Sequence, residues 1–404
     1  MDITRNGIIQ RRKDGATTLM RPNRSGGPMT EIEVPDTLAE EFRLVTGDVV
    51  EGETTMVAED EPDRLISIKR INGLDLEDAE ERPFPRTNRG RAERTPPDRL
   101  LMLETGAKDV TGRMLDFAAP LGAGGFGIVY GPHGGGLTRT LQAVLSGTTA
   151  NSPDCVTLVL LLRARAEEAT EWRGKFPQAD IVAGSSTFRE GTPEQTLLLC
   201  DLVLEAAQRQ TELGRDVVLL IDSLTALWGA MLEAEEADAQ QEADTSLARQ
   251  RIREWTQKAG CFHGAGLLGN GIGGSLTMIG AVWNRATDIE AEEERDIHPH
   301  LRLLEYVLPE AAWQIALSNT LTEKRLYPTI DIKKCRSQDE EKLLPAAIRE
   351  RFLTVRGSLP RHDSLSCHLK VMAALETSAN INGLLDALTD STDSDDRPKS
   401  AFPF

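Results

Sequence analysis

A glycine-rich segment at residues 131–138 matches a phosphate-binding loop at every fixed position except one. Its sequence is G-P-H-G-G-G-L-T, so Leu137 stands where the template G-x-x-x-x-G-K-[ST] has its lysine, while Thr138 keeps the hydroxyl. An apolar run precedes the segment and a helical pattern follows it, which is the context in which loop amides and a helix N-terminus bind phosphate. The alternative is an ordinary glycine-rich turn between a strand and a helix. The predicted nucleotide contacts in this loop are Gly131, Gly134, Gly135, Gly136 and Thr138.

An acidic residue ends a second apolar run, about 85 residues after the loop. The sequence from Asp216 to Ser223 is D-V-V-L-L-I-D-S, which predicts a buried strand with Asp222 at its carboxyl end. A Walker B acid has this position in P-loop enzymes, where it and the loop hydroxyl hold Mg²⁺. The alternative is that Asp222 caps the following helix. Because the two motifs occur together, they favour a nucleotide site with Thr138 and Asp222 as its Mg²⁺ residues.

The composition is that of a globular chain with room for two or three domains. It has 404 residues, of which 40% are hydrophobic, and 64 acidic against 46 basic side chains give a net charge of -18. No stretch has the roughly 18 to 20 apolar residues of a membrane helix, and the N-terminus lacks the apolar core of a signal peptide. We therefore expect a cytoplasmic protein without membrane contact. The negative charge opposes tight binding to a nucleic-acid backbone.

The cysteines and histidines do not form a metal or disulfide pattern. Five cysteines are scattered along the chain without C-x-x-C spacing, and the six histidines are dispersed. The sequence therefore predicts buried thiols and no structural metal. The cysteines are Cys155, Cys200, Cys261, Cys335 and Cys367.

Two polar segments divide the chain into domains. Residues 82–99 contain six arginines and four prolines without a hydrophobic period, which predicts an extended linker. The arginines of this segment keep the protein soluble or, as the alternative, make weak contacts with phosphate groups. Residues 390–404 are polar and predict a disordered acidic tail. The predicted domains are therefore residues 1–81 and 100–389.

The first domain, residues 1–81, alternates short apolar strands with glycine-containing turns. About five strands in this length are typical of a small β-barrel such as an OB-fold. Barrels of this kind stack bases on exposed aromatic side chains, but the segment after Gly15 is A-T-T-L-M-R, without an aromatic residue. The strand candidates are 7–11, 17–21, 31–34, 48–54 and 64–71.

The second domain, residues 100–389, alternates apolar runs with helical segments. This rhythm predicts an α/β fold with a largely parallel sheet covered on both faces. The predicted strands are 156–162, 180–184, 217–221, 276–282 and 314–317. The predicted helices are 138–145, 193–209 and 247–258.

Seven blocks along the chain resemble bacterial transcription termination factor Rho and follow that family's order, from residue 7 to about residue 380. The resemblance implies an OB-fold followed by a RecA-like P-loop domain in a hexameric, RNA-dependent ATPase. It implies ATP with Mg²⁺ as cofactor, RNA as ligand, and a ring of this chain alone or mixed with an intact Rho, with RNA polymerase as a further partner. The blocks are 42–52, 112–122, 153–156, 167–171, 222–225, 273–277 and 322–331.

The residues that carry catalysis in the Rho family differ here. Leu137 replaces the P-loop lysine. Arg139 lies one residue after Thr138, so its side chain should point about 100° around the helix from the side chain of Thr138. Ala164 falls at the catalytic glutamate, in a segment that here is R-A-R-A-E-E. The arginine finger aligns with Gln338, in a register ambiguous by one position, with Arg336 as the nearest substitute. Because a finger alone contributes about 10³–10⁵ in rate, we expect hydrolysis at or near background.

The residues that bind RNA in the family are altered as well. Its OB-fold aromatic pair corresponds to Ala16 and Thr18, near Arg21, which removes stacking platforms worth about 1–3 kcal/mol per base. Its central loop corresponds to residues 242–247, and its second pore loop, which begins here at Arg285, continues into an acidic run. Acidic pore loops would repel phosphates, so RNA should bind weakly if at all. The alternative is that these runs are solvated helix faces.

Other family positions persist. Asp222 keeps the Walker B acid, Arg325 keeps a basic residue near the phosphates, and Tyr327 keeps the aromatic residue that stacks on adenine. Arg165, a further predicted nucleotide contact, survives within the altered glutamate segment. These residues would allow weak binding of ATP with Mg²⁺. The alternative is that they remain for packing.

Three hypotheses follow from these observations. The first is a catalytically silent, ring-forming Rho paralogue with a regulatory or scaffold role. The second is an active RNA-dependent ATPase and translocase that uses substitutes such as Arg139 and Arg336. The third is an interaction protein that no longer binds nucleotide. The substitutions favour the first.

Overall fold

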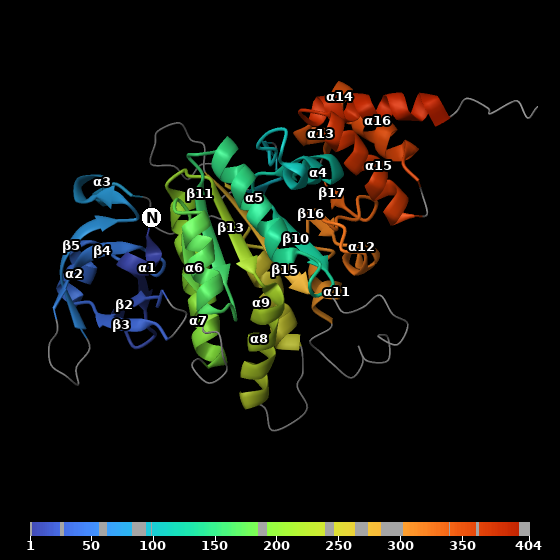
Figure 1. Cartoon of the computed structure of the whole chain (residues 1–404). Helices are drawn as coiled ribbons and strands as arrows, with labels where there is room; N and C mark the ends of the chain where they lie inside the picture. Colours follow the sequence, from blue (N-terminus) through green and yellow to red (C-terminus); the bar gives the residue numbers. More distant parts are fainter. Residues whose placement is uncertain are drawn as a thin grey trace, which may run out of the picture.

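The computed structural model of the chain contains a small N-terminal sheet, a larger central sheet and a group of C-terminal helices (Figure 1). The small sheet and the C-terminal helices lie at opposite ends of the central sheet. The structure describes residues 2–24, 28–55, 63–82, 94–97, 99–184, 192–238, 246–262, 274–283, 302–338, 340–360 and 363–395.

The small sheet has the strand order β1-β2-β3-β5-β4, with β6 beside β5. Neighbouring strands on this path are antiparallel, except that β3 and β5 are parallel. An isolated bridge between Ile8 and Val49 joins the first strand to the residue before β4. The five predicted strands are confirmed, with ends shifted by at most two residues. The strands are β1 (Ile8–Arg11), β2 (Thr17–Arg21), β3 (Thr30–Glu33), β4 (Val50–Thr55), β5 (Asp63–Ile71) and β6 (Leu74–Asp75).

The turn between β1 and β2 has the chemistry that its sequence predicts. The Ala16 amide donates to Asp14 Oδ1 at 3.0 Å, and Gly15 has a φ of 94°, a conformation that favours glycine. The strands on either side bury one shared apolar core. Three short helices accompany the sheet: α1 (Ile3–Asn6), α2 (Asp36–Glu41) and α3 (Leu76–Glu80).

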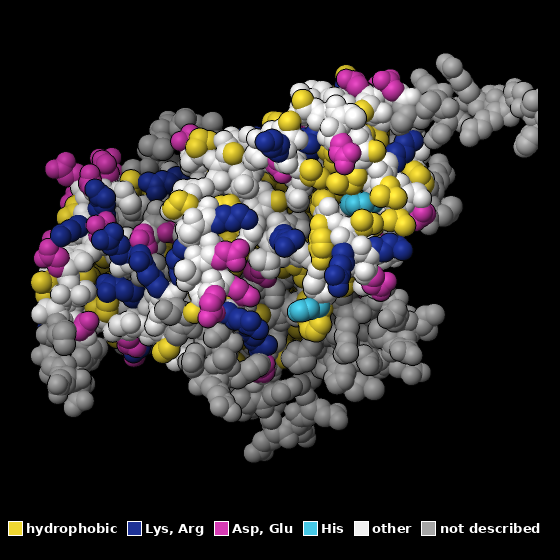
Figure 2. Space-filling model, in the orientation of Figure 1, with side chains coloured by type: hydrophobic (Ala, Val, Ile, Leu, Met, Phe, Trp, Pro, Cys, Tyr) yellow, Lys and Arg dark blue, Asp and Glu magenta, His cyan; other side chains and the backbone are white. Residues whose placement is uncertain are grey.

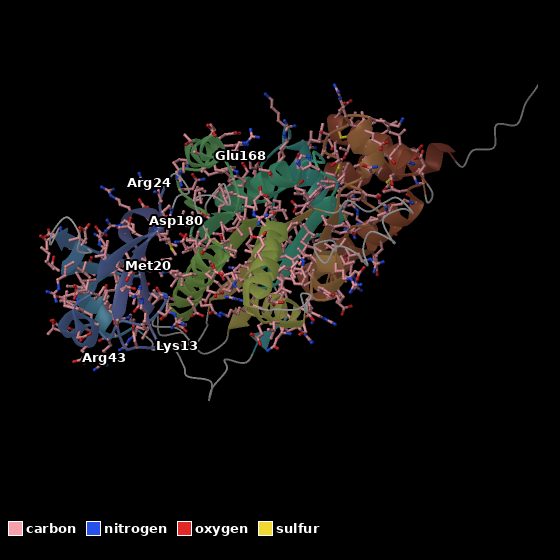
Figure 3. The ribbon with its side chains drawn as sticks, turned by 90° about the horizontal axis from the view of Figure 1, so that it is seen from below. Lys13, Met20, Arg24, Arg43, Glu168 and Asp180 are labelled. Atoms are coloured by element: carbon pink, nitrogen blue, oxygen red, sulfur yellow. The ribbon has the colours of Figure 1, made fainter. Side chains whose placement is uncertain are left out.

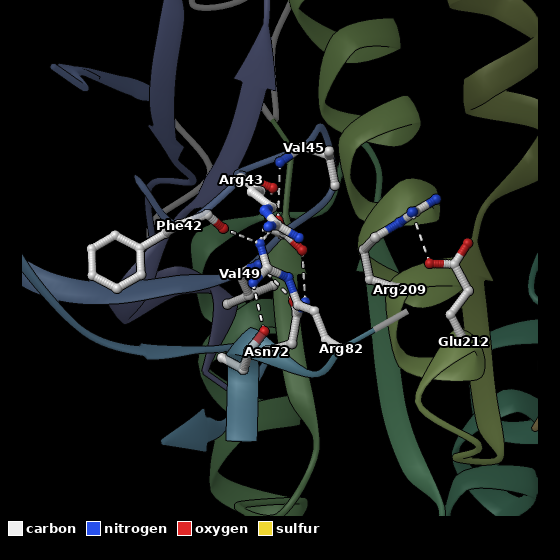
Figure 4. A network of polar contacts seen from close by, with 10 residues as sticks. Phe42, Arg43, Val45, Val49, Asn72, Arg82, Arg209 and Glu212 are labelled. Carbon is white, nitrogen blue, oxygen red and sulfur yellow. Dashed lines mark hydrogen bonds and ion pairs between the residues drawn. The ribbon is translucent and has the colours of Figure 1, made fainter. Parts of the chain in front are cut away.

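Arg82 is buried inside the N-terminal domain and is not part of an extended linker (Figure 4). Its Nη2 lies 3.3 Å from Asp48 Oδ2, and its guanidinium also donates to the carbonyls of Phe42 and Ala79. The Asn72 amide donates to the same Asp48 carboxylate at 2.7 Å. The predicted linker 82–99 is therefore wrong at its first residue.

The far end of that segment is also part of the folded structure. Residues Arg94–Thr95 form β7, which pairs with β14 (Gly260–Phe262) at the edge of the central sheet. Arg99 forms an ion pair with Asp216 at 2.5 Å. Residues 83–93 lie outside the described part of the chain.

The central sheet has the order β12-β11-β13-β15-β10-β16-β17, with β14 beside β15. Its first six strands are parallel, whereas β17 and β14 run antiparallel to β16 and β15. This confirms the parallel α/β domain, and each predicted strand is present. The strands are β10 (Phe126–Gly131), β11 (Val156–Leu161), β12 (Asp180–Ala183), β13 (Val217–Asp222), β15 (Ser275–Trp283), β16 (Trp313–Ala316) and β17 (Arg336–Ser337).

Helices cover both faces of this sheet because each strand is apolar on both sides. One core contains α5, α6 and the C-terminal helices, and the other contains α7, α8 and α9. The three predicted helices are present as α5, α7 and α9. The helices are α5 (Leu137–Asn151), α6 (Ala166–Lys175), α7 (Pro193–Glu212), α8 (Leu224–Asp238) and α9 (Ser246–Thr256).

The C-terminal helices pack on one end of the central sheet, next to α4. The last of them continues to Asp395, so residues 390–395 of the predicted disordered tail are helical, and residues 396–404 lie outside the described part. The remaining elements are α4 (Val110–Ala118), β8 (Leu100–Leu101), β9 (Leu121–Gly122), α11 (Leu303–Val307), α12 (Asn319–Glu323), α13 (Glu340–Leu343), α14 (Ala346–Ser358), α15 (Ser364–Thr377) and α16 (Ile381–Asp395).

The two domains share a hydrophobic core where α1 meets β12 and β1 meets α7. Ile3, Ile8 and Val49 of the N-terminal domain are buried in the same cluster as the residues of α7. Met20 belongs to this cluster too and lies, with Asp180, where the blue and green ribbons meet (Figure 3). The domains are therefore docked through apolar contacts.

The helices of the described ranges are too short or too polar to span a lipid bilayer.

Candidate nucleotide site

The glycine-rich loop joins β10 to α5 at the carboxyl end of the central sheet. Gly134 and Gly136 have φ values of 76° and 94°, which a side chain would disfavour. A Cβ on Gly131 would lie 2.6 Å from the Cβ of Leu317, so the strand leaves no space for one. In a parallel sheet, ligands bind at this carboxyl edge, where the chain passes from strand to helix. The loop therefore has the geometry that the sequence predicts for a phosphate-binding loop.

Leu137 is the first residue of α5 and packs against the hydrophobic core beneath the helix. It is half-buried and also borders the cavity in front of the loop. An apolar side chain thus stands where a P-loop lysine would neutralise phosphate charge. Residues 131–138 contain no lysine or arginine.

Thr138 and Asp222 meet across the site. The Thr138 hydroxyl donates to Asp222 Oδ2 at 2.7 Å. The parallel pairing of β11 with β13 brings Asp222 beside Leu161. At the start of α8, the Ala226 amide donates to the Ser223 hydroxyl at 3.2 Å. A side chain that caps this helix would bind the same amide, so Ser223 has that role and Asp222 does not. Asp222 therefore faces the loop hydroxyl, not the helix that follows it.

The carboxyl of Asp222 has a shifted protonation equilibrium. Burial raises the pKa of Asp222, the charge of Glu168 acts in the same direction, and the hydrogen bond from Thr138 opposes both. A cation placed between Thr138 and Asp222 would stabilise the ionised form.

A cavity of about 780 Å³ opens in front of the loop. His133 and Trp283 meet edge to face on one wall, with ring centroids 5.8 Å apart. The volume of the cavity is in the range of small-molecule sites. The lining residues are His133, Gly134, Gly136, Leu137, Thr138, Arg139, Leu162, Arg163, Asp222, Ser223, Thr225, Ala226, Trp283 and Tyr327.

Tyr327 lies over the glycine-rich loop. Its hydroxyl donates to the Gly134 carbonyl at 3.0 Å, and the residue is 42% exposed. The guanidinium of Arg139 lies 5.5 Å from the centroid of that ring. Thr329 donates to the next carbonyl of the loop, that of Gly135. Tyr327 thus presents an exposed aromatic face at the cavity.

Ala164 lies at the mouth of an adjoining cavity of about 440 Å³ and packs partly against the core. Its methyl group cannot take a proton from water, so this position holds no general base. Glu168 also lines this cavity, and its carboxylate accepts the Arg165 amide at 3.1 Å at the start of α6 (Figure 3).

Four predicted site residues lie away from these cavities. Arg165 and Arg325 are exposed, and neither lines the cavities described above. Arg336 lies on β17, and the Gln338 amide donates to the Ala312 carbonyl at 2.7 Å. One arginine that the sequence analysis missed, Arg163, lines both cavities. Arg163 is the first residue of the segment R-A-R-A-E-E, to which the sequence analysis gave no role at this position.

The residues aligned with the RNA-binding aromatic pair have different environments. Ala16 is exposed at the β1–β2 turn, whereas Thr18 is only 5% exposed, so Thr18 offers no surface for a base. Arg21 is half-buried, and its Nε donates to the Asn6 carbonyl at 3.4 Å. Arg285 and most of the two pore-loop segments lie outside the described residues.

Basic side chains on the N-terminal domain are interspersed with acidic ones (Figure 2). Arg12 pairs with Glu31, and Lys69 pairs with Glu53 at 2.8 Å. These partners neutralise the charge locally, which weakens the attraction of this surface for a nucleic-acid backbone.

The described residues contain no group of three or more His, Cys, Asp or Glu side chains that could hold a metal. The five cysteines are free thiols, four of them buried and Cys155 half-buried. Burial raises the pKa of Cys155 to about 12, which disfavours a reactive thiolate.

Comparisons with known proteins agree with this geometry. The ATP synthase alpha/beta family, nucleotide-binding domain, matches residues 112–337. The chain is 28% identical to transcription termination factor Rho of Bacillus subtilis over 364 residues, which are 87% of this chain and 78% of that one. It is also 28% identical to Rho of Escherichia coli K12 over 353 residues, which cover 85% and 77% of the two chains.

Two solved structures share the fold. One is a prototypical ATPase from the type III secretion system of pathogenic bacteria, with a TM-score of 0.53, 16% identity, and coverage of 77% of this chain and 91% of that chain. The other is the ATP synthase subunit NeqB of Nanoarcheaum equitans, with a TM-score of 0.56, 16% identity, and coverage of 77% and 78%.

Proposed function

The chain belongs to the ATP synthase alpha/beta family and is a homologue of transcription termination factor Rho, and on that premise we propose that it binds nucleotide but turns it over at or near the background rate. In this proposal it acts as a regulatory or scaffold member of a Rho-type ring. One observation supports it most: the cavity and its Thr138–Asp222 pair are formed, while Leu137 and Ala164 take the positions of the catalytic side chains.

The residues present fit a nucleotide with Mg²⁺. Thr138 and Asp222 lie within hydrogen-bond distance of each other, so these two side chains would hold the metal. Mg²⁺ usually takes its remaining ligands from phosphates and water, which agrees with the lack of a larger acidic cluster among the described side chains. When bound, the metal would neutralise charge on the phosphates. Tyr327 offers its exposed ring to a base.

The missing lysine of the loop and the missing carboxylate at Ala164 affect the chemical step more than the fold. Without a lysine in the loop, charge developing on the β- and γ-phosphates loses its usual contact. Without a carboxylate at Ala164, no group at that position orients or deprotonates the attacking water. General-base catalysis is worth about 10²–10⁴ in rate, so the two losses together would leave little turnover.

We further propose that the N-terminal sheet is an OB-type barrel that has lost most of its grip on RNA. The strand order β1-β2-β3-β5-β4 and the bridge from Ile8 to Val49 support a closed barrel. The burial of Thr18 and the ion pairs on the surface support weak RNA binding. A ring that includes this chain would then contain a subunit that neither hydrolyses ATP nor pulls RNA.

The active-translocase alternative has one observation in its favour, because Arg139 and Arg163 both border the cavity and carry charge that the loop lacks. The two functions separate in an RNA-stimulated ATPase assay on the purified chain. We expect a rate equal to that of Asp222→Ala with and without RNA, whereas RNA-stimulated hydrolysis above that control would favour the active enzyme. Mass photometry on the same samples, with and without an intact Rho, would test ring assembly.

A further inference from the structure

The nucleotide cavity has lost its loop lysine but has gained an arginine from a different strand. We propose that Arg163 supplies the cationic contact to the phosphates of the bound nucleotide, in place of the P-loop lysine. This inference rests on the nucleotide binding proposed above and assigns the group that makes it possible.

Arg163 lies near the carboxyl end of β13 because of the strand pairing that precedes it. Strand β11 runs parallel to β13, with Leu161 opposite Asp222. The next amide, that of Leu162, donates to the Asp222 carbonyl at 2.7 Å. Arg163 is one residue beyond this bond and lines both cavities, in front of the loop and beside Ala164. Its backbone therefore lies beside the end of β13 that carries Asp222.

The backbone and side chain of Arg163 are held by specific contacts. Its φ is 59°, in the left-handed region that non-glycine residues seldom adopt and that is enriched at functional sites. Its Nη2 lies 2.8 Å from Glu233 Oε1, and its guanidinium lies against Gly229. Ala226, Gly229 and Glu233 follow one another at helical spacing on α8, but of these three only Ala226 lines the cavity. The Arg163 guanidinium is therefore held beyond the turn of α8 that lines the cavity.

A phosphate can compete with Glu233 for this guanidinium. The Arg163 and Glu233 side chains are 38% and 25% exposed, and ion pairs with this much water contact are weak. A nucleotide phosphate offers several charged oxygens, and the planar guanidinium binds such groups through two parallel hydrogen bonds. In the bound state, Arg163 turns from Glu233 towards the phosphates.

Arg139 lines both cavities as well. Its guanidinium lies 5.5 Å from the centroid of the Tyr327 ring, where it could contact a stacked base. Arg163 follows the residue whose amide bonds to the Asp222 carbonyl. We therefore assign the phosphate contact to Arg163 and the contact with the base to Arg139.

The test is calorimetric titration of ADP, ATP and adenosine into the full-length chain and its variants, with Mg²⁺ present. We expect Arg163→Ala to weaken ADP and ATP binding by about tenfold to a hundredfold, because it removes a charge-assisted contact, and to leave adenosine affinity unchanged. Arg163→Lys should retain part of the affinity. In the Arg163→Ala background, Leu137→Lys should restore binding by returning the cation to the loop.

Arg251→Ala is the matched control, because Arg251 also forms a 2.8 Å ion pair with an acid, Asp201, between two helices and away from both cavities. It should bind all three ligands as the wild type does. Equal ADP affinity of Arg163→Ala and wild type would overturn the inference, as would an equal loss with adenosine. Absence of ADP binding to the wild type would overturn it too, yet would leave the lack of turnover standing. ATP hydrolysis faster than that of Asp222→Ala would contradict the proposed lack of turnover, but it would not bear on the role of Arg163 in binding.

Discussion

Asp222 is the residue whose protonation links the site to the stability of the chain. Burial raises its pKa, so the folded chain holds this proton more tightly than the unfolded chain does. Its contribution to stability is therefore complete below the ordinary carboxyl pKa, near 4, and declines as pH rises through the raised value. We expect Asp222→Asn to match the wild type in melting temperature at about pH 4 and to exceed it at about pH 8, in buffer without nucleotide.

The control for this titration is Asp363, which caps α15. The Ser366 hydroxyl and the Leu365 amide lower the pKa of Asp363, so its contribution to stability is present at neutral pH and lost in acid. Asp363→Asn should therefore be less stable than the wild type at neutral pH, with the difference shrinking towards acid. If the two variants respond to pH in the same direction, the assignment for Asp222 is wrong.

A single change at Leu137 should return a cation to the phosphate-binding loop. We expect Leu137→Lys to strengthen ATP binding by at least about tenfold, because a lysine here would reach the phosphates, at a stability cost of about 1 kcal/mol from lost apolar burial. Leu137→Met is the volume-conserving control and should change neither quantity appreciably. Calorimetric titration and urea unfolding measure the two effects, and unchanged ATP affinity in the lysine variant would show that the cavity does not admit phosphates.

The sequence predicted individual site residues where a local motif carried the information. Thr138 and Tyr327 border the cavity as expected because each belongs to a contiguous block. Arg163 was missed because its place at the cavities depends on the pairing of β11 with β13, which spacing along the chain does not reveal. The sequence shows directly that Thr18 has no aromatic ring. Its burial, by contrast, depends on the neighbouring strands, which the local sequence does not reveal.

At the level of elements, the small sheet depends on a buried ion pair at its end. Arg82 and Asp48 have side chains only 5% and 1% exposed, and Asn72 completes the network. Because Arg82→Met leaves the Asp48 charge buried without its cation, we expect a loss of about 3–5 kcal/mol. Arg70→Met, at an exposed pair with Asp75, should cost less than about 1 kcal/mol. Denaturant unfolding measures both, and equal small losses would contradict the structural role of Arg82.

The same network shows where prediction of elements failed. Strand periodicity and turn residues located five of the six strands of the small sheet, because those signals lie within each segment. Arg82 was assigned to a linker because residues 82–99 contain six arginines and four prolines without a hydrophobic period. Its burial is imposed by Asp48 and Asn72, which the sequence separates from it by intervening elements. Helix α16 likewise continues through polar residues that composition alone predicts to be disordered.

At the scale of the whole molecule, the shared core predicts that both domains unfold together. Ile8 and Val49 pack with residues of α7, so loss of either domain exposes apolar surface of the other. We expect one calorimetric transition, with Val49→Ala, in the shared core, and Leu65→Ala, in the core of the small sheet, each lowering the same melting temperature. Two resolved transitions, with only one shifted by Leu65→Ala, would show that the domains are independent.

The family match spans the central domain, and the similarity to Rho extends over both domains. The proposed loss of turnover rests on two positions of the site, Leu137 and Ala164. In this proposal, the molecule combines the α/β core and the cavity with altered chemistry at these two residues.

The most direct test of this account is a single-turnover experiment, with the chain in excess over radiolabelled ATP and with Mg²⁺ and RNA present. Filter binding measures nucleotide retained, and acid quenching measures ADP formed, in the same samples. We predict that ATP is bound and recovered intact, with ADP forming no faster than in Asp222→Ala. Conversion of the bound ATP to ADP, accelerated by RNA and abolished by Asp222→Ala, would contradict the account.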